Sequence, residues 1–582
     1  MHTFIIIPLV SLSILIDIDV MESQFKRKEY DNQQQQDDSQ LLKKYSKLLE
    51  EADEADFEEL NPTTLKKMVL SFEKKFSTNQ DQRSKFNNQP EKFMQSEIEL
   101  DEEIKKLQII ATAPELYPLL VKLGTVVSLG SLLDHENVDI TIDAIDLFNE
   151  LVQQEQEAEE KVLIHGLLEN GVLIGFVQAL SSRLQTANPD HKQAIESALA
   201  IIEMSIDAIP TDVSQSLIEH SNIFQYFFSV IKSKDAPLSL RLNCSELLSI
   251  ILQDNEKGRY VFGKKDGIDN LLIIISQFKK KSPESLEETE MIENLFTSLY
   301  SCLFDQSNKN IFLKSEGIEL MLLIIKNKTT LRGSALKVLD YELNNHKESN
   351  QKFVDALGLK TLFSSLMKKL KQKHQSKKEY KKIYNQDQDE EHIIIILQSL
   401  FSQLDKNRLE RLLSKFTENN GEKIDRLFEL FEKYNNKVKN AEDKIKKEIL
   451  NRDEDDDEDI DEDEILLQRM DAGLFKLQNI CLIISHLYGQ QDKMFKEKIE
   501  NIAKKDGKRL SLDIINVLNG ITTTFPKFNH HPPKCFESMI YFYHNPKVRI
   551  VIIHYYQFMS PTSSTLASTT IATIPTLSLR ER

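Results

Sequence analysis

Apolar residues along most of the chain recur with the spacing of an amphipathic α-helix. The first clear example follows Pro62, where one helix face carries apolar residues at i, i+3, i+4 and i+7, namely Leu65, Met68, Val69 and Phe72. Lysines and a glutamate occupy the opposite face. This pattern predicts a helix that caps the N-terminal end of the ordered chain.

From about residue 109 the helical pattern itself repeats. A glycine followed by an apolar stripe occurs five times, and a sixth copy has asparagine in place of glycine. The copies begin at Gly124, Gly171, Asn222, Gly267, Gly317 and Gly358, which are 41 to 51 residues apart. Because glycine, and next to it asparagine, best tolerates a left-handed backbone, we expect a left-handed helix cap at each start.

A second amphipathic helix follows several of these starts, as in residues 140–152, 240–252 and 331–343. Each contains a small residue that lets two helices approach closely, namely Ala144, Cys244 and Ala335. Helix pairs at a period of about 40–47 residues are typical of armadillo and HEAT repeats. We therefore predict an all-α fold, an armadillo/HEAT-like α-solenoid superhelix with N- and C-terminal helical caps. An irregular helical bundle, the alternative, does not repeat glycine and apolar offsets six times.

The pattern continues beyond the repeats and is interrupted once by charge. Residues 409–450 and 469–488 predict further helices, separated by eleven acids in the twelve residues 453–464. The predicted division is: 1–20, an apolar extension; 21–60, a disordered acidic and Gln-rich segment; 61–108, a helical cap; 109–405, armadillo-like repeats; 406–519, C-terminal helices with the acidic loop 453–464; and 520–582, a divergent, disordered tail.

The apolar stretch 4–16 allows two interpretations. Its 13 residues fall short of the roughly 18 that a membrane span needs, and no basic region precedes it. A polar stretch opens at Met21. Residues 1–20 are therefore either a targeting segment or an upstream extension from a misplaced start, and we expect no membrane association.

Composition supports a helical chain and excludes several classes of protein. Glycine and proline together make up only 31 of 582 residues, too few for turn-rich β folds. The net charge of −18 disfavours direct binding to nucleic acid. Eleven of the negative charges lie in residues 453–464, so the remainder of the chain is nearly balanced.

The sequence contains no motif that indicates catalysis. No phosphate-binding glycine loop, nucleophile elbow or H-E-x-x-H is present, and the four cysteines show no metal-ligand spacing. His530, His531 and Cys535 lack a matching second half of a metal site, and we do not interpret them as ligands. We predict no enzymatic activity, no cofactor and no metal.

The clearest basic motif is a lysine-rich segment at residues 366–382. It is either a bipartite nuclear import signal or a flexible basic loop between helices. Its lysines are Lys368, Lys369, Lys371, Lys373, Lys377, Lys378, Lys381 and Lys382.

Several stretches resemble the beta-catenin-like family of armadillo-repeat, spliceosome-associated nuclear proteins. They include KKMVLSFEKKF (66–76), LLSKFTENNGEKIDRLFEL (412–430) and LQRMDAGLFKLQNIC (467–481), and the likeness runs from about residue 60 to 519. The resemblance implies residence in the nucleus and association with the NineTeen complex of the spliceosome through its Myb-domain scaffold subunit. It also implies binding of basic nuclear-localisation-type segments, self-association through the N-terminal cap, and no catalysis.

These features together suggest a non-enzymatic splicing scaffold whose armadillo groove holds basic peptides. Asp139, Asp143 and Glu246 are candidate groove residues because they lie in or near the second helices of repeats. A nuclear transport adaptor of the importin-like armadillo type is the alternative. The chain departs from the family at the weak basic cluster Lys26–Lys28, the long acidic run and the segment after Asn519.

Overall fold

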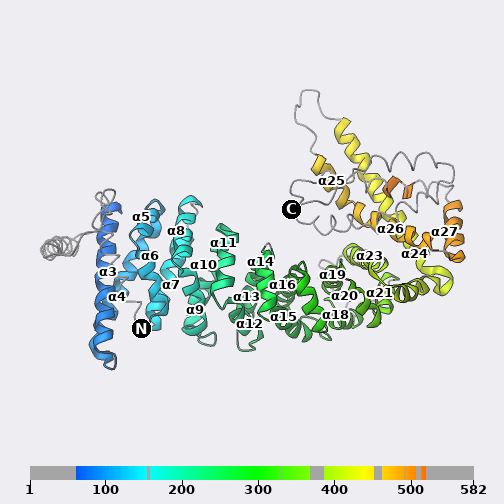
Figure 1. Cartoon of the computed structure of the whole chain (residues 1–582). Coiled ribbons are helices and arrows are strands. Elements are labelled where there is room, and N and C mark those ends of the chain that lie inside the picture. Colours follow the sequence, from blue (N-terminus) through cyan, green and yellow to red (C-terminus); the bar gives the residue numbers. More distant parts are fainter. Residues whose placement is uncertain are drawn as a thin grey trace, which may run out of the picture. The chain divides into compact units, whose positions relative to one another are not determined.

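The computed structural model describes residues 60–153, 157–253, 255–327, 329–367, 386–450, 462–490, 492–505, 513–514 and 516–518 (Figure 1). Within these ranges the regular elements are helices, and no strand occurs. Contacts divide the chain into two compact units. Unit 1 is Met1–Asn270 with Glu284–Ser301, and unit 2 is Leu271–Pro283 with Cys302–Arg582.

Unit 1 begins with a pair of long helices and continues with shorter ones. The bounds are α3 Pro62–Lys85, α4 Pro90–Leu107, α5 Tyr117–Lys122, α6 Thr125–Ser131, α7 Val138–Val152, α8 Glu157–Glu169, α9 Val172–Ser182, α10 Lys192–Ala208, α11 Pro210–His220, α12 Ile223–Lys232, α13 Leu238–Gln253 and α14 Glu256–Lys264. Short 3₁₀ segments are η1 Gln108–Thr112, η2 Pro114–Leu116, η3 Leu132–Asp134 and η4 Pro189–His191. Helices α15 (Gly267–Ser276) and α16 (Leu286–Cys302) cross the boundaries between the units.

Helix α3 starts where the sequence predicts it. The Asn61 side chain accepts hydrogen bonds from the backbone N–H of Thr63 and Thr64, at 2.9 and 3.1 Å, and Pro62 occupies the first helical position. All four predicted apolar residues of its inner face are at most 5% exposed. Helix α3 packs along α4, and this pair is the predicted N-terminal cap.

The repeats of unit 1 contain three helices each. Helices of the same rank contact one another from repeat to repeat: α5 contacts α8, α6 contacts α9 and α9 contacts α12, while α7 contacts α10 and α10 contacts α13. Three-helix units that stack in this way are armadillo repeats, and the predicted all-α armadillo fold is confirmed. The sequence pattern predicted only two helices per repeat, because first helices such as α5 and α14 are only six and nine residues long.

Glycine at the repeat starts serves two different purposes. Gly124 and Gly171 are left-handed helix caps, with φ of 75° and 71°, as predicted. Asn222 has φ −99° and ψ 30°, so the prediction of a left-handed cap there was wrong. In unit 2, Gly317 lies one residue later, as the first residue of its helix, and the left-handed residue is Glu316, with φ 58°.

At these later starts glycine makes room for an aromatic ring. A Cβ atom on Gly267 would lie 2.4 Å from the ring of Phe262, and one on Gly317 would lie 2.5 Å from the ring of Phe312. Gly358 meets Phe353 in the same way, at 2.6 Å from its carbonyl oxygen. In each case the phenylalanine precedes the glycine by five residues, so the short first helix of the repeat packs directly against the start of the second.

Unit 2 contains further repeats and the C-terminal helices. The bounds are α17 Gln306–Lys314, α18 Gly317–Lys326, α19 Arg332–Leu343, α20 Lys347–Asp355, α21 Gly358–Leu366, α23 Gln386–Gln403, α24 Lys406–Leu450, α25 Glu462–Asp471, α26 Leu474–Gly489 and α27 Lys493–Lys505. Helix α18 contacts α21 and α19 contacts α23, which repeats the pairing by rank seen in unit 1.

The C-terminal helices are interrupted where polar residues and glycine fall together. Helix α24 breaks at Glu418–Gly421, where Asn419, Asn420 and Gly421 have left-handed backbones. The predicted helix 469–488 is two helices, because Gly473, with φ 101°, separates α25 from α26. Helix α24 buries the apolar residues Leu412, Phe416, Ile424, Leu427 and Phe428, whereas Leu413 is half-buried.

The first turns of α23 connect three neighbouring helices of unit 2 through ion pairs. Asp389 binds Arg332 of α19 at 2.5 Å, and His392 contacts Asp340 of α19 at 2.9 Å. Glu390 accepts hydrogen bonds from Arg426, Lys433 and Tyr434 of α24, at 3.0, 2.6 and 2.9 Å, and Glu391 pairs with Lys476 of α26. Asp389 and Glu390 are each only 5% exposed, so these are buried, paired charges.

Candidate functional site

The third helices of unit 1 carry a series of acidic side chains. Helices α4, α7, α10 and α13 contact one another in that order and follow one another along unit 1 (Figure 1). We use the name acidic face for six acidic side chains on these helices, namely Asp101 on α4, Asp143 and Asp146 on α7, Glu203 and Asp207 on α10, and Glu246 on α13.

The acidic face begins with two coupled carboxyl groups. Asp101 and Asp143 are hydrogen-bonded to each other between α4 and α7, and Lys105 Nζ lies 2.7 Å from Asp101 and 3.8 Å from Asp143. Burial, and then the Asp101 carboxylate, raise the pKa of Asp143 to about 7. Although burial acts to raise it, hydrogen bonds from Asp143 and Lys105 hold the pKa of Asp101 below its usual value. The pair therefore retains a proton near neutral pH.

Asp146 lies one turn further along α7 and reaches towards α10. Its side chain hydrogen-bonds with Ser197 of α10, and burial still raises its pKa above the ordinary value. Because Asp143 and Asp146 are three residues apart, both project to the same side of α7. The acidic face is thus continuous from α4 across α7 to α10.

The far end of the acidic face consists of carboxylates without a basic partner. Burial, and then the charges of Glu246 and Asp207, raise the pKa of Glu203. Within the described residues, no lysine, arginine or histidine forms an ion pair with Glu203, Asp207 or Glu246. Like charges that lie close together without a counter-ion favour a bound cation, and the site can supply that attraction to a basic side chain.

Of the three predicted groove residues, Asp143 and Glu246 are among those that define this face. Asp139 is exposed and lies one turn before Asp143, on the same side of α7 and in the first turn of the helix. The Asp139 backbone N–H donates to Asn137 at 3.1 Å. Peptide binding by these residues stays a prediction. Sequence reasoning missed the other residues of the face, namely Asp101, Asp146, Glu203 and Asp207.

Other predicted features fall outside the described residues. All eight lysines of the candidate import signal do so, as do His530, His531, Cys535 and residues 453–461 of the acidic run. In the part of the chain that the structure describes, no group of three or more His, Cys, Asp or Glu residues is arranged to hold a metal ion. Cys244, Cys302 and Cys481 are buried free thiols.

Helix length and hydropathy show whether a helix could cross a membrane. Among the described helices, none by itself is both long and apolar enough to cross a membrane. Two strongly bent helix pairs reach that length and composition only together, Pro114–Lys122 with Thr125–Asp134 and Glu160–Glu169 with Val172–Ser182.

Comparison with known proteins identifies relatives over most of the chain. A family model described as "Catenin-beta-like, Arm-motif containing nuclear" matches residues 43–519. Beta-catenin-like protein 1 of Bos taurus and that of Homo sapiens are each 39% identical to this chain over 463 residues, which is 78% of this chain and 80% of the relative. The Beta-catenin-like protein 1 homolog of Schizosaccharomyces pombe is 31% identical over 459 residues, with 77% and 78% covered.

Solved structures that align with part of this chain include two designed or engineered proteins. An engineered protein aligns with a TM-score of 0.32 and 14% identity, covering 47% of this chain and 97% of its own. A designed armadillo repeat protein aligns with a TM-score of 0.29 and 18% identity, covering 42% of this chain and 93% of its own.

Proposed function

Because the chain belongs to the catenin-beta-like family of Arm-motif containing nuclear proteins, we propose that it is a nuclear, non-enzymatic scaffold of pre-mRNA splicing. In this proposal it joins the NineTeen complex through the Myb-domain scaffold subunit of that complex. The acidic face binds basic nuclear-localisation-type segments of its partners. The observation that supports this most directly is the group of unpaired carboxylates formed by Glu203, Asp207 and Glu246.

The physical basis of the proposed binding is electrostatic complementarity. A lysine or arginine side chain placed between α10 and α13 neutralises carboxylates that now repel one another, so binding relieves an existing cost. Exposed carboxylates at the far end attract the peptide over a distance of about 10 Å at ordinary salt. When the Asp101–Asp143 pair loses its proton, its two negative charges exceed the single positive charge of Lys105, and the excess attracts a second basic side chain.

A binding assay with charge-neutralised variants tests this proposal. The probe is a fluorescent synthetic peptide with two lysine clusters, titrated with the full chain at low and at high salt. Replacing Glu203, Asp207 and Glu246 with the corresponding amides removes three charges, each worth about 0.5 kcal/mol at an exposed position, so we expect about tenfold weaker binding. Asp212→Asn with Glu219→Gln, two exposed acids on α11, is the control. Binding that is unchanged in the triple variant, or indifferent to salt, contradicts the proposal.

The assembly part of the proposal has its own test. Affinity purification of the full chain from nuclear extract, followed by mass spectrometry, should recover splicing proteins that include the Myb-domain subunit. Size fractionation of the same extract separates the alternative, a nuclear transport adaptor. Co-migration with spliceosomal RNA supports the scaffold, whereas co-migration with import receptors supports the adaptor.

We also propose that the chain self-associates through its N-terminal cap. Met94 and Ile98 lie one turn apart on α4 and are 55% and 47% exposed, which is unusual for large apolar side chains. Light scattering after size-exclusion chromatography should report a dimer that Met94→Lys with Ile98→Lys converts to a monomer. Ile273→Lys, at a position 56% exposed on α15, is the control and should leave the dimer intact.

A further inference from the structure

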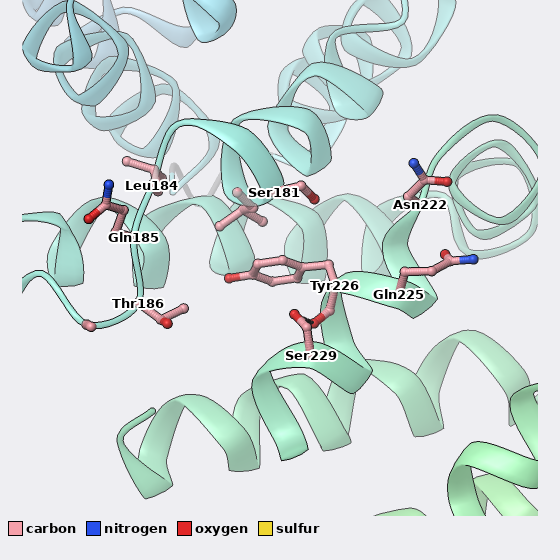
Figure 2. A pocket seen from close by; sticks show the side chains of 10 residues that line it. Ser181, Leu184, Gln185, Thr186, Asn222, Gln225, Tyr226 and Ser229 are labelled. Atoms are coloured by element: carbon pink, nitrogen blue, oxygen red, sulfur yellow. Dashed lines mark hydrogen bonds between the residues drawn. The ribbon is translucent and has the colours of Figure 1, made fainter. Parts of the chain in front are cut away.

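Unit 1 also contains a pocket that lies apart from the acidic face. It lies between the C-terminal end of α9, the residues that follow it, and α12 (Figure 2). The cavity has a volume of about 430 Å³, which is within the range of roughly 300–1,000 Å³ found for ligand pockets. Its lining residues are Leu180, Ser181, Leu184, Gln185, Thr186, Ala187, Asn222, Gln225, Tyr226 and Ser229. We name it the α9–α12 pocket.

A buried hydroxyl group without a hydrogen bond lies in this pocket. Tyr226 is only 5% exposed, and its hydroxyl has no hydrogen-bond partner. Figure 2 shows its ring lying across the pocket, with the hydroxyl directed to the side of Leu184 and Thr186. Burial raises the pKa of Tyr226, so the hydroxyl stays protonated and available as a donor. Leaving a buried polar group unpaired is unfavourable, and a ligand that accepts this hydrogen bond removes that cost.

Two serine hydroxyls of the pocket are available as acceptors. The hydroxyl of Ser181 donates to the Val177 carbonyl at 2.8 Å, and that of Ser229 donates to the Tyr226 carbonyl at 2.7 Å. Their hydrogens are therefore used locally, and their oxygen lone pairs remain for a ligand N–H. At the rim, the exposed amide groups of Gln185 and Gln225 can donate and accept.

The pocket offers nothing to balance a charged ligand. All ten lining residues are uncharged. Arg183 follows α9 directly, but its guanidinium binds the carboxylate and the carbonyl of Asp134, at 2.7 and 2.8 Å. Because a buried charge needs a partner, a carboxylate or an ammonium group is disfavoured here. Leu180 and Leu184 supply an apolar wall for a short hydrocarbon stem.

We propose that the α9–α12 pocket binds the carboxamide of an asparagine or glutamine side chain on a partner polypeptide. The carboxamide oxygen accepts from Tyr226, its NH₂ group donates to serine hydroxyl oxygens, and its CH₂ groups contact the leucines. The rim amides of Gln185 and Gln225 pair with the peptide groups on either side, and this favours a polypeptide over a free amino acid. The site uses other residues and neutral chemistry, so it does not depend on the acidic face.

Saturation-transfer NMR with small probes and the full chain tests this assignment. The probe is N-acetyl-glutamine N-methylamide, compared with the capped glutamate and methionine analogues of similar size and with free glutamine. We expect binding of the capped glutamine alone, and about threefold to tenfold weaker binding in Tyr226→Phe, which loses one hydrogen bond. Ser181→Ala should weaken binding in the same direction. Tyr260→Phe, at a position 47% exposed on α14, is the matched control.

Each possible outcome decides one part of the proposal. Equal binding of the glutamate or methionine analogue overturns the carboxamide specificity, and equal binding of free glutamine overturns the polypeptide as its source. No detectable transfer, or unchanged binding in a folded Tyr226→Phe variant, overturns the proposal that Tyr226 binds a carboxamide in this pocket. Circular dichroism establishes that each variant is folded. The titration of the basic peptide should be unaffected by Tyr226→Phe, which separates failure of this site from failure of the acidic face.

Discussion

A buried carboxyl group in the N-terminal cap makes the stability of that cap depend on pH. Glu73 of α3 is 1% exposed, and its Oε1 atom has no hydrogen-bond partner. Burial raises its pKa from 4.5 to about 7, against a smaller opposing effect of a hydrogen bond with Ser128 of α6. The folded cap therefore binds this proton more tightly than the unfolded chain does. Its stability is greatest below pH 4.5 and declines as pH rises to about 7.

The size of this effect follows from the two pKa values. One pKa unit corresponds to about 1.4 kcal/mol, so the cap loses about 3 kcal/mol of stability between pH 4.5 and pH 7. Glu73→Gln keeps the shape of the side chain and removes the charge. At pH 8 the variant cap should be more stable than the natural one by about 1–3 kcal/mol, because glutamine still buries a polar group. At pH 5 the two should be nearly equal.

Hydrogen exchange measured by mass spectrometry reports this stability locally. The free energy of opening of α3 peptides is measured from pH 5 to 8, after correction for the intrinsic exchange rate. The natural chain should show a decline with pH that Glu73→Gln abolishes. Asp81→Asn, at an exposed position on the same helix, is the matched control and should retain the decline. An equal pH dependence in Glu73→Gln and the natural chain would refute the reasoning.

Three further substitutions test other parts of the structure. Gly317→Ala places a methyl group against the ring of Phe312 and should destabilise α18 by about 1–3 kcal/mol, measured by hydrogen exchange, whereas Gly489→Ala, which meets nothing within 4 Å, should not. Basic-peptide affinity should rise several-fold from pH 6 to 8 as Asp143 loses its proton, and Asp143→Asn should flatten that profile in fluorescence titrations. Glu390→Gln removes a buried carboxylate that accepts hydrogen bonds from Arg426, Lys433 and Tyr434, and should cost about 1–3 kcal/mol, seen as a lower midpoint in urea denaturation.

Apolar periodicity predicted the second and third helices of each repeat and missed the first. The missed helices, such as α17 and α20, are nine residues long and mostly polar. Helix α20 buries only two large apolar residues, Phe353 and Val354. A helix this short gains its stability from packing rather than from its own sequence, so periodicity alone does not reveal it. The phenylalanine five residues before each later glycine is the signal that could have revealed it.

The sequence predicted only part of the candidate site, because the rest depends on contacts between segments that are distant in the sequence. Asp143 and Glu246 were predicted from their place in second helices, and the structure puts both on the acidic face. Asp101 was missed because it belongs to the cap, whose contact with α7 joins segments about 40 residues apart. No local sequence pattern indicates that contact. Spacing within α10 did contain a signal for Glu203 and Asp207, which are four residues apart and so share one side of the helix.

Two groups of acidic residues, one in each unit, differ in whether they have basic partners. In unit 2, Asp389, Glu390 and Glu391 of α23 each pair with a basic side chain on a neighbouring helix, so their charge is neutralised within the fold. In unit 1, Glu203 and Glu246 meet mainly one another, and no basic side chain of the described residues pairs with them. Composition cannot distinguish these cases, since both sets are acids on amphipathic helices. Net charge is therefore a poor guide to where a basic partner binds, and the pairing of each carboxylate is a better one.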